Sequence, residues 1–328
     1  MVIRNRIVPV VCSLFLLSLL SACSDSGFSD PPVDPYRDTF IGASGVVESS
    51  FFCRPATKGN GQLLIHLVGS FVDASIDSST GFARHACTHG FAALVPAYDN
   101  RNPARIVCGE HDLCHEDFHR EILFGTEGAP EPVNVGYADS IVGIVSDLLH
   151  DLTADDPGYD WGSLATEFEA GSLQSATVSG HSQGNGHALF WAREEVFRRV
   201  ILLGGVADRL GPTAAEDDRV TWLKEMAGKS STPIERIKSF YHLDEDGLTG
   251  IIGSRANLTR IGVSPFCDYF NLESRCSAIE IPEMGCVNPV AAHGVVLYET
   301  FSESCNPEGS LSNAKTWDLL LLDGASPR

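Results

Sequence analysis

The sequence predicts an α/β fold, with a mainly parallel β-sheet that helices cover on both faces. Short apolar runs rich in β-branched residues alternate with segments of helical periodicity, which is the pattern of such a sheet. Several of the runs end at glycine, serine or aspartate, and one ends in a tight, glycine-flanked turn at 180–184. The 328 residues suit one large domain with insertions, or at most two domains.

The first predicted elements lie between residues 62 and 97. Residues 62–68 (QLLIHLV) form an apolar run closed by Gly69 and Ser70, which predicts a buried strand. Residues 79–89 are expected to be helical, and residues 91–97 to form the next strand. Residues 100–136 carry two cysteines and many charges, and we expect them to be irregular.

The remaining elements repeat the alternation. Residues 138–152 predict a helix, because their apolar side chains recur on one face. Further strands are expected at 175–179, 200–203 and 237–242, and further helices near 214–228, 249–261 and 311–322. Binding sites in such sheets lie outside the carboxyl ends of the strands. At this carboxyl end of the sheet we therefore expect Ser70, Ser182, Asp208, Asp244 and Asp246.

The turn at 180–184 reads Gly-His-Ser-Gln-Gly and lies between a predicted strand and a helix-like segment. G-x-S-x-G in this context is a nucleophile turn, in which strain exposes the serine and glycines relieve clashes two residues before and after it. Gly186 is expected to allow the helix to pack closely on the strand. A glycine-rich turn without chemistry is the alternative, but a late His-Gly pair favours Ser182 as a catalytic nucleophile.

A serine hydroxyl needs a base that takes its proton during attack. Three histidines follow Ser182 in the sequence. His187 lies on the helix of the turn and is expected to pack there, and His242 ends a strand ahead of the candidate acids. His293 lies late in the chain on an expected loop, where a chain order of serine, acid and histidine requires the base. We therefore predict His293.

The triad acid should follow a strand and hold the imidazole in the required tautomer. Asp246 ranks first, because Gly247 and an apolar residue follow it; Asp244 ranks second and Asp208 third.

The oxyanion formed during attack needs backbone donors. One is expected from Gln183, directly after the serine, and the other from Ser70, with Phe71 as the alternative.

The N-terminus predicts export. Arg4 and Arg6 precede an apolar run at 8–20 that is too short for a comfortable membrane span. Leu-Ser-Ala-Cys at 20–23 resembles the bacterial lipobox, in which Cys23 becomes the lipidated first residue; the alternative is an ordinary cleaved signal. We expect a leader at 1–22, a tether at 23–35 and the domain at 36–328, anchored in the cell envelope. Ser24 after the cysteine favours the outer membrane.

The cysteines and the charge fit this compartment. Eight cysteines remain after Cys12 and Cys23, and an even number in an exported chain predicts disulfides. Cys108–Cys114 and Cys267–Cys276 are plausible local bridges, whereas Cys53, Cys87, Cys286 and Cys305 cannot be paired from sequence. No C-x-x-C pair supports a zinc site. The net charge of −20 argues against nucleic acid and anionic lipid as electrostatic partners.

Residues from about 60 to 300 resemble secreted bacterial α/β-hydrolase-fold serine hydrolases. The nearest likeness is a little-characterised lipoprotein group with three motifs: a glycine-containing turn (Gly69-Ser70), a cysteine followed by Arg-Glu (Cys114 to Arg120-Glu121) and the G-H-S-Q-G-x-G-H-A turn at 180–188. This chain has Phe71-Val72 where relatives often have Gly-Gly. The resemblance implies a hydrolase and fixes no substrate.

A histidine series favours a different chemistry. His111, His115 and His119 are spaced four residues apart and would share one helical face, as metal ligands do. We favour a charged, disulfide-pinned insertion instead, because Cys108, Gly109 and Cys114 indicate a bent loop.

The expected function is hydrolysis of small-molecule or lipid carboxylic esters through an acyl-enzyme, with no cofactor and no metal. The alternatives are a peptidase or thioesterase with the same triad, a non-catalytic binding lipoprotein on this scaffold, and a metal-dependent protein centred on the three histidines.

Overall fold

The structure is a computed structural model. It describes residues 39–41, 47–56, 59–125, 133–206, 208, 210, 220–247, 254–272, 276–282, 286, 289–298, 305 and 312–322. The predicted leader, the lipidation residue Cys23 and the tether lie outside these residues. Within the described part, no helix is long and apolar enough to cross a membrane.

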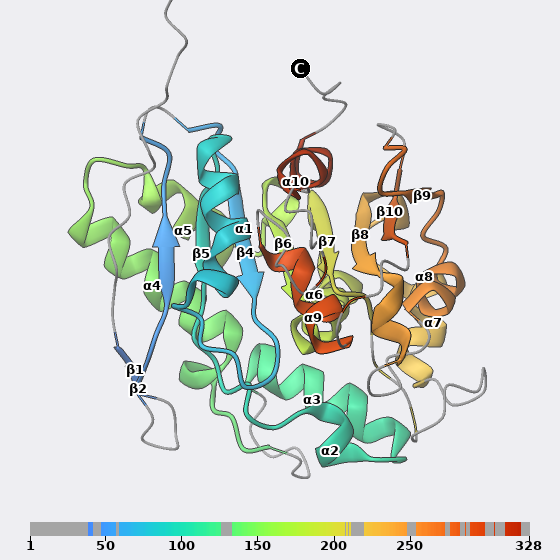
Figure 1. Cartoon of the computed structure of the whole chain (residues 1–328). Coiled ribbons are helices and arrows are strands. Elements are labelled where there is room, and N and C mark those ends of the chain that lie inside the picture. The colour runs from blue at the N-terminus through green and yellow to red at the C-terminus, as the bar shows by residue number, and fades with distance from the viewer. Residues whose placement is uncertain are drawn as a thin grey trace, which may run out of the picture. The chain divides into compact units, whose positions relative to one another are not determined.

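An eight-stranded sheet forms the centre of the domain (Figure 1). Its order is β3-β5-β4-β6-β7-β8-β10-β9, and only the β3–β5 pair is antiparallel. The strands are β3 (Phe51–Cys53), β4 (Leu63–Leu67), β5 (Ala92–Val95), β6 (Thr177–His181), β7 (Arg199–Leu203), β8 (Ile237–His242), β9 (Phe266–Asp268) and β10 (Ala278–Ile281). A separate antiparallel pair joins β1 (Thr39–Ile41) and β2 (Val47–Ser49).

Helices connect the strands and cover the sheet (Figure 1). They are α1 (Asp77–Thr88), α2 (Ala104–Cys108), α3 (Asp112–Phe124), α4 (Ile141–Asp155), α5 (Trp161–Glu169), α6 (Gln183–Glu194), α7 (Thr221–Lys229), α8 (Ser254–Ile261), α9 (Pro289–Gly294) and α10 (Ala314–Leu321). Short 3₁₀ turns are η1 (Tyr137–Asp139), η2 (Leu173–Ser175), η3 (Ile234–Arg236), η4 (Leu243–Gly247) and η5 (Val295–Leu297). The chain steps from β4 to β5 in one direction along the sheet, and from β6 to β7 in the other direction. Because crossovers between parallel strands are right-handed, the connecting helices α1 and α6 lie on opposite faces of the sheet.

Burial explains the apolar runs of the sequence. Every residue of β4, β5, β6 and β7 is buried, as expected for parallel strands covered on both faces. The four tryptophans of the chain lie in the helical layers and are almost completely buried. The register sets Gly180 opposite Leu67 of β4 and Leu202 of β7. The carboxyl ends of these three strands therefore meet at one place on the rim.

This topology is the α/β-hydrolase fold, and it confirms the predicted fold class. The strands expected near 62–68, 91–97, 175–179, 200–203 and 237–242 are all present. Strands β3, β9 and β10 and helix α5 were not expected, because they are short or lie in segments with mixed patterns. The loop predicted around His293 is the short helix α9.

The prediction that residues 100–136 are irregular was wrong for the part from 104 to 124, which contains α2 and α3. Gly109, with φ 51°, ends α2, and a disulfide between Cys108 and Cys114 pins the corner before α3. In α3, charged residues separate the apolar ones in the sequence, so the face that buries Phe118 and Ile122 is hard to recognise from the sequence alone. A charged surface with a narrow buried stripe is easily mistaken for a loop.

Four disulfides join the eight cysteines of the domain. Cys108–Cys114 and Cys267–Cys276 are the pairs predicted from their spacing, and the structure confirms them. The remaining four pair as Cys53–Cys87 and Cys286–Cys305, which sequence alone left open. The first ties β3 to α1, and the second closes the segment that contains His293.

Candidate active site

The turn between β6 and α6 holds Ser182 in a strained conformation. Its φ of 54° and ψ of −122° lie outside the usual regions for an L-residue. A Cβ on Gly180 would lie 2.2 Å from the carbonyl oxygen of Gly184, and a Cβ on Gly184 would lie 2.2 Å from that of Leu67. The backbone thus excludes any side chain at both positions, as predicted, and the half-buried serine is presented at the rim.

The turn after β4 passes directly over this serine. A Cβ on Gly69 would lie 2.9 Å from the Cβ of Ser182. The Phe71 amide donates to the carbonyl oxygen of Asn100 at 3.2 Å, whereas among the described residues the Ser70 amide has no acceptor. Gln183 is the first residue of α6, so its amide has no partner within the helix. The geometry therefore favours Ser70 over Phe71 as the second donor beside Gln183.

His293 lies on α9, next to the residue that precedes the serine. Its ring centroid is 4.5 Å from that of His181, whose Nε2 donates to the His293 carbonyl oxygen at 3.1 Å. Its Nδ1 lies 3.0 Å from Oε2 of Glu245. Its Nε2 is buried without a hydrogen-bond partner among the described residues. One ring nitrogen is thus held by a carboxylate, and the other makes no hydrogen bond to Ser182 or to any other described residue.

Glu245 is the carboxylate that contacts His293. It lies on η4, directly after β8, and is 1% exposed. Its Oε1 accepts a hydrogen bond from the backbone N–H of His242 at 3.0 Å, and its Oε2 accepts one from Nδ1–H of His293. The two donors fix the carboxylate in place. A buried carboxylate on Nδ1 sets the tautomer in which Nε2 is free to accept a proton.

The ranking of three aspartates left this residue out. The carboxylate of Asp208 is buried and bonded to Nε2 of His119. Oδ2 of Asp244 accepts from the backbone N–H of Cys286 at 3.1 Å. The side chain of Asp246 lies outside the described residues. Asp244 and Glu245 are neighbours on this 3₁₀ turn and contact different groups, so the sequence could place the acid in the turn without choosing among its carboxylates.

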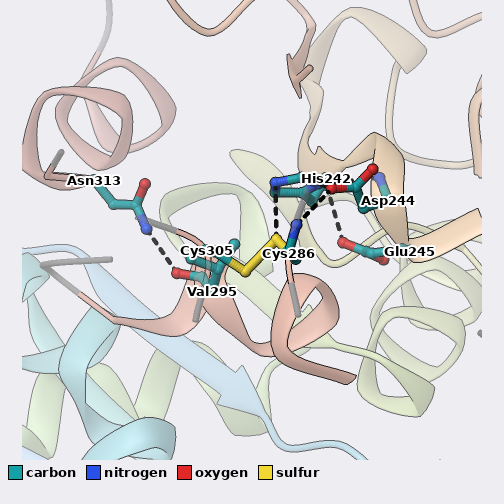
Figure 2. The surroundings of a disulfide bond; sticks show 7 residues. All are labelled: His242, Asp244, Glu245, Cys286, Val295, Cys305 and Asn313. Atoms are coloured by element: carbon teal, nitrogen blue, oxygen red, sulfur yellow. Dashed lines mark hydrogen bonds and ion pairs between the residues drawn. A yellow bond between two sulfur atoms is a disulfide. The ribbon is translucent and has the colours of Figure 1, made fainter. Parts of the chain in front are cut away.

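The Cys286–Cys305 disulfide lies beside His242 and Asp244, as Figure 2 shows, and closes the segment that contains His293. Cys286 packs its sulfur 3.4 Å from Nε2 of His242. After His293, the carbonyl oxygen of Val295 accepts from Nδ2 of Asn313 at 2.8 Å. The segment that carries His293 is therefore held to η4 at one end and to the start of α10 at the other.

Burial keeps the neighbouring histidines neutral. It lowers the pKa of His181 well below the usual value, and the nearby His293 lowers it further. Burial also lowers the pKa of His242, against the opposing charge of Asp244. A neutral His181 adds no positive charge beside the imidazole that must accept a proton.

The predicted histidine series does not converge on one point. His111 precedes α3 and is exposed, and Nε2 of His115 lies 3.1 Å from the carbonyl oxygen of Gly109. His119 contacts Asp208 through Nε2 and His187 through Nδ1. His187 packs in the interior as expected, and its contact with His119 was not expected.

Two other groups resemble metal sites. His242, Asp244 and Cys286 lie within reach of one another, but the disulfide leaves Cys286 no thiolate to ligate a metal. Nε2 of His85 and Nε2 of His89 lie 2.7 and 2.8 Å from the same oxygen of Asp318. This second group ties the last turn of α1 to α10.

A cavity of about 680 Å³ opens at the opposite end of the strands, near the start of β4 and α5. Arg54, Tyr159 and Glu167 are among its lining residues. The Arg54 guanidinium is held by Asp156 at 2.6 Å. Because Ser182 follows the carboxyl end of β6, this cavity at the amino end of the strands is not adjacent to it.

Comparisons with known proteins add no assignment beyond the fold. No protein-family model and no curated protein sequence matches the chain. A thermostable esterase shares 13% identity at a TM-score of 0.40, over 88% of this chain and 62% of that one. The esterase Est22 shares 11% identity at 0.41, over 89% and 81% of the two chains. A cold-adapted esterase from an Arctic intertidal metagenomic library shares 12% at 0.39, over 75% and 83%.

Proposed function

We propose that the protein is a serine hydrolase that cleaves carboxylic esters through an acyl-enzyme. One observation carries the proposal: buried Glu245 holds Nδ1 of His293 at 3.0 Å, and the same ring, whose Nε2 has no partner among the described residues, packs 4.5 Å from the ring of His181, directly before the strained Ser182. Serine, acid and histidine occur in this order along the chain.

In the proposed reaction, Oγ of Ser182 attacks the ester carbonyl carbon as Nε2 of His293 takes the hydroxyl proton. Glu245 keeps the ring in the accepting tautomer and stabilises the imidazolium. The amides of Gln183 and Ser70 donate to the developing oxyanion. The imidazolium then returns its proton to the departing alkoxide, which leaves as an alcohol. Water attacks the acyl-enzyme by the same steps and releases the acid.

An ester is favoured over an amide as the substrate, because an alkoxide is a better leaving group than an amide anion, so that the nitrogen of an amide must be protonated before it departs. A peptidase or thioesterase with the same residues is the second candidate. It would show faster turnover of an amide or thioester than of the matched ester.

The test uses an active-site fluorophosphonate probe and a set of p-nitrophenyl esters of increasing chain length. The wild type should react with the probe and hydrolyse the esters, and Ser182→Ala should do neither. The matched control is Ser179→Ala, which changes a buried serine on β6, the strand that leads into the Ser182 turn. Absence of labelling in wild-type protein with a cooperative thermal transition would favour a non-catalytic binding lipoprotein.

We also propose attachment to the outer membrane through a lipid on Cys23. The lipobox-like sequence at 20–23 supports it, and four disulfides suit an oxidising compartment. Radiolabelled palmitate should enter the wild type and not Cys23→Ser. A wild-type protein whose mature N-terminus is unlipidated would contradict the anchor and leave the hydrolase proposal standing.

A further inference from the structure

Behind the nucleophile turn, two completely buried histidines connect a buried aspartate to the oxyanion turn. Nε2 of His119 contacts Oδ2 of Asp208, and Nδ1 of His119 lies 2.9 Å from Nδ1 of His187. Nε2 of His187 lies 3.4 Å from Nε2 of Gln183. Oε1 of Gln183 accepts from the hydroxyl of Ser70 at 2.5 Å. The chain of contacts thus runs from α3 through α6 to the turn after β4.

Packing holds the two rings in place. The Phe190 ring stacks on His119 at 5.8 Å between centroids, and the Phe118 ring stacks on His187 at 5.7 Å. A Cβ on Gly186 would lie 2.6 Å from Cε1 of His119. We predicted that Gly186 allows the helix to pack closely on the strand. Instead, the missing side chain at Gly186 leaves space for the His119 ring. An apolar side chain in place of either histidine would fill the same space, so packing alone does not explain two imidazoles here.

The directions of the hydrogen bonds follow from the two ends of the chain. Burial raises the pKa of Asp208, but its hydrogen bond with His119 lowers it and the pKa stays below its usual value, so the carboxylate accepts. Burial lowers the pKa of His187 well below its usual value, so His187 carries one ring proton. Since the Gln183 amide nitrogen donates to Nε2 of His187, that proton is on Nδ1.

The remaining proton positions follow by exclusion. Nδ1–H of His187 donates to Nδ1 of His119, whose own proton is on Nε2 and is donated to Asp208. Each donor faces one acceptor along the chain. Three hydrogen bonds thus connect the Asp208 carboxylate to the Gln183 amide, and a fourth connects that amide to the Ser70 hydroxyl. The carbonyl oxygen of Asn102, which accepts from Nε2 of Gln183 at 3.4 Å, favours the same orientation of the amide.

We propose that His119 and His187 are positioning residues that hold Gln183 and Ser70, the two oxyanion donors of the proposed hydrolase, through this hydrogen-bond chain. The inference rests on the proposed function, since both backbone donors belong to that reaction. A shift of either amide changes the stabilisation of the transition state far more than the binding of the ground-state ester.

The experiment compares His187→Phe and His119→Phe, which keep a ring and break the chain, with His115→Phe, a buried histidine on the same helix outside it. Losing an oxyanion donor outright costs about 100- to 1,000-fold in kcat. We expect the first two variants to lose about 10- to 100-fold in kcat with KM changed less than about twofold, and the control to retain kcat. A boronic acid inhibitor, which mimics the tetrahedral state, should lose affinity in parallel with kcat.

A double-mutant cycle separates positioning from general stability. In a Gln183→Ala background the chain no longer reaches Ser70, so adding His119→Phe should cost less than about twofold. Fully additive losses, or an unchanged kcat in folded His119→Phe and His187→Phe, would overturn the inference. Asp208→Asn, which still offers an acceptor oxygen to His119, should recover most of the activity that Asp208→Leu loses.

A second readout does not depend on turnover. Nitrogen NMR of histidine-labelled wild type should show His119 as the Nε2–H tautomer and His187 as the Nδ1–H tautomer, with both patterns lost in Asp208→Leu. The opposite tautomers would refute the chain even in an active enzyme. An inactive wild type with the expected tautomers would refute the hydrolase instead.

Discussion

Replacing Glu245 with glutamine is expected to remove nearly all ester hydrolysis while leaving the fold intact. The two carboxylate oxygens each accept an N–H, one from His242 and one from His293, both at 3.0 Å. Glutamine has one acceptor oxygen, so an amide NH₂ must face one of these donors. Because the backbone N–H of His242 cannot change, the amide oxygen turns to it and the NH₂ faces Nδ1 of His293.

That arrangement forces the wrong tautomer. Nδ1 becomes the acceptor and Nε2 carries the proton, so His293 cannot take the proton of Ser182. The corresponding carboxylate-to-amide change in a serine protease triad lowers kcat about 10,000-fold. We expect a loss of about 1,000- to 10,000-fold here, which is about 4 to 5.5 kcal/mol in activation free energy.

The assay is steady-state hydrolysis of p-nitrophenyl acetate, with thermal unfolding as the check on folding. Asp246→Asn and Asp244→Asn are the matched controls from the same turn, and each should keep at least about a tenth of the wild-type kcat. Glu245→Asp should fall in between, because the shorter side chain reaches the same donors poorly. A folded Glu245→Gln that keeps its activity, alongside an inactive Asp246→Asn, would refute the reasoning and restore the aspartate as the acid.

Three further outcomes follow from the same contacts. Replacing Cys286 and Cys305 together by serine should lower the free energy of unfolding by about 3 kcal/mol in urea titrations, since the bridge closes a loop of 19 residues next to the base. Gly184→Ala should prevent folding or abolish activity, because its Cβ would lie 2.2 Å from a carbonyl oxygen, whereas Gly136→Ala, with open space around it among the described residues, should leave the thermal midpoint unchanged. Burial lowers the pKa of His66 to about 4. As the pH falls below about 6.5, this histidine is therefore protonated in the unfolded chain but stays neutral in the folded protein. Stability should drop between about pH 6.5 and 4, and His66→Gln should remove about 3 kcal/mol of that drop; an unchanged slope would contradict the buried neutral histidine.

The fold was largely predictable, for identifiable reasons. The runs at 62–68 and 200–203 are apolar throughout because both faces of their strands are covered, and this pattern is visible without a structure. The helices α2 and α3 were missed because their buried stripe lies among many charges. The local disulfide Cys108–Cys114 could be read from spacing, whereas Cys286–Cys305 could not.

The site was predictable in part. The sequence placed the nucleophile turn, the late histidine and the turn after the strand at 237–242, because each depends on local backbone geometry or on chain order. It did not indicate Glu245, although glutamate serves as well as aspartate in this position. Its neighbour Asp246 ranked first instead, because Gly247 and an apolar residue follow it, as in a common pattern.

The sequence by itself determined the strained corner at Ser182, because glycines two residues away on each side are a local requirement of a tight turn. Only the tertiary structure decided which carboxylate meets His293 and that His119, His187 and Asp208 gather behind the turn. These contacts join segments far apart in the chain, and they depend on where neighbouring elements dock. A side chain's direction on a short 3₁₀ turn, or across a helix packed in the core, carries no signal in the order of the residues.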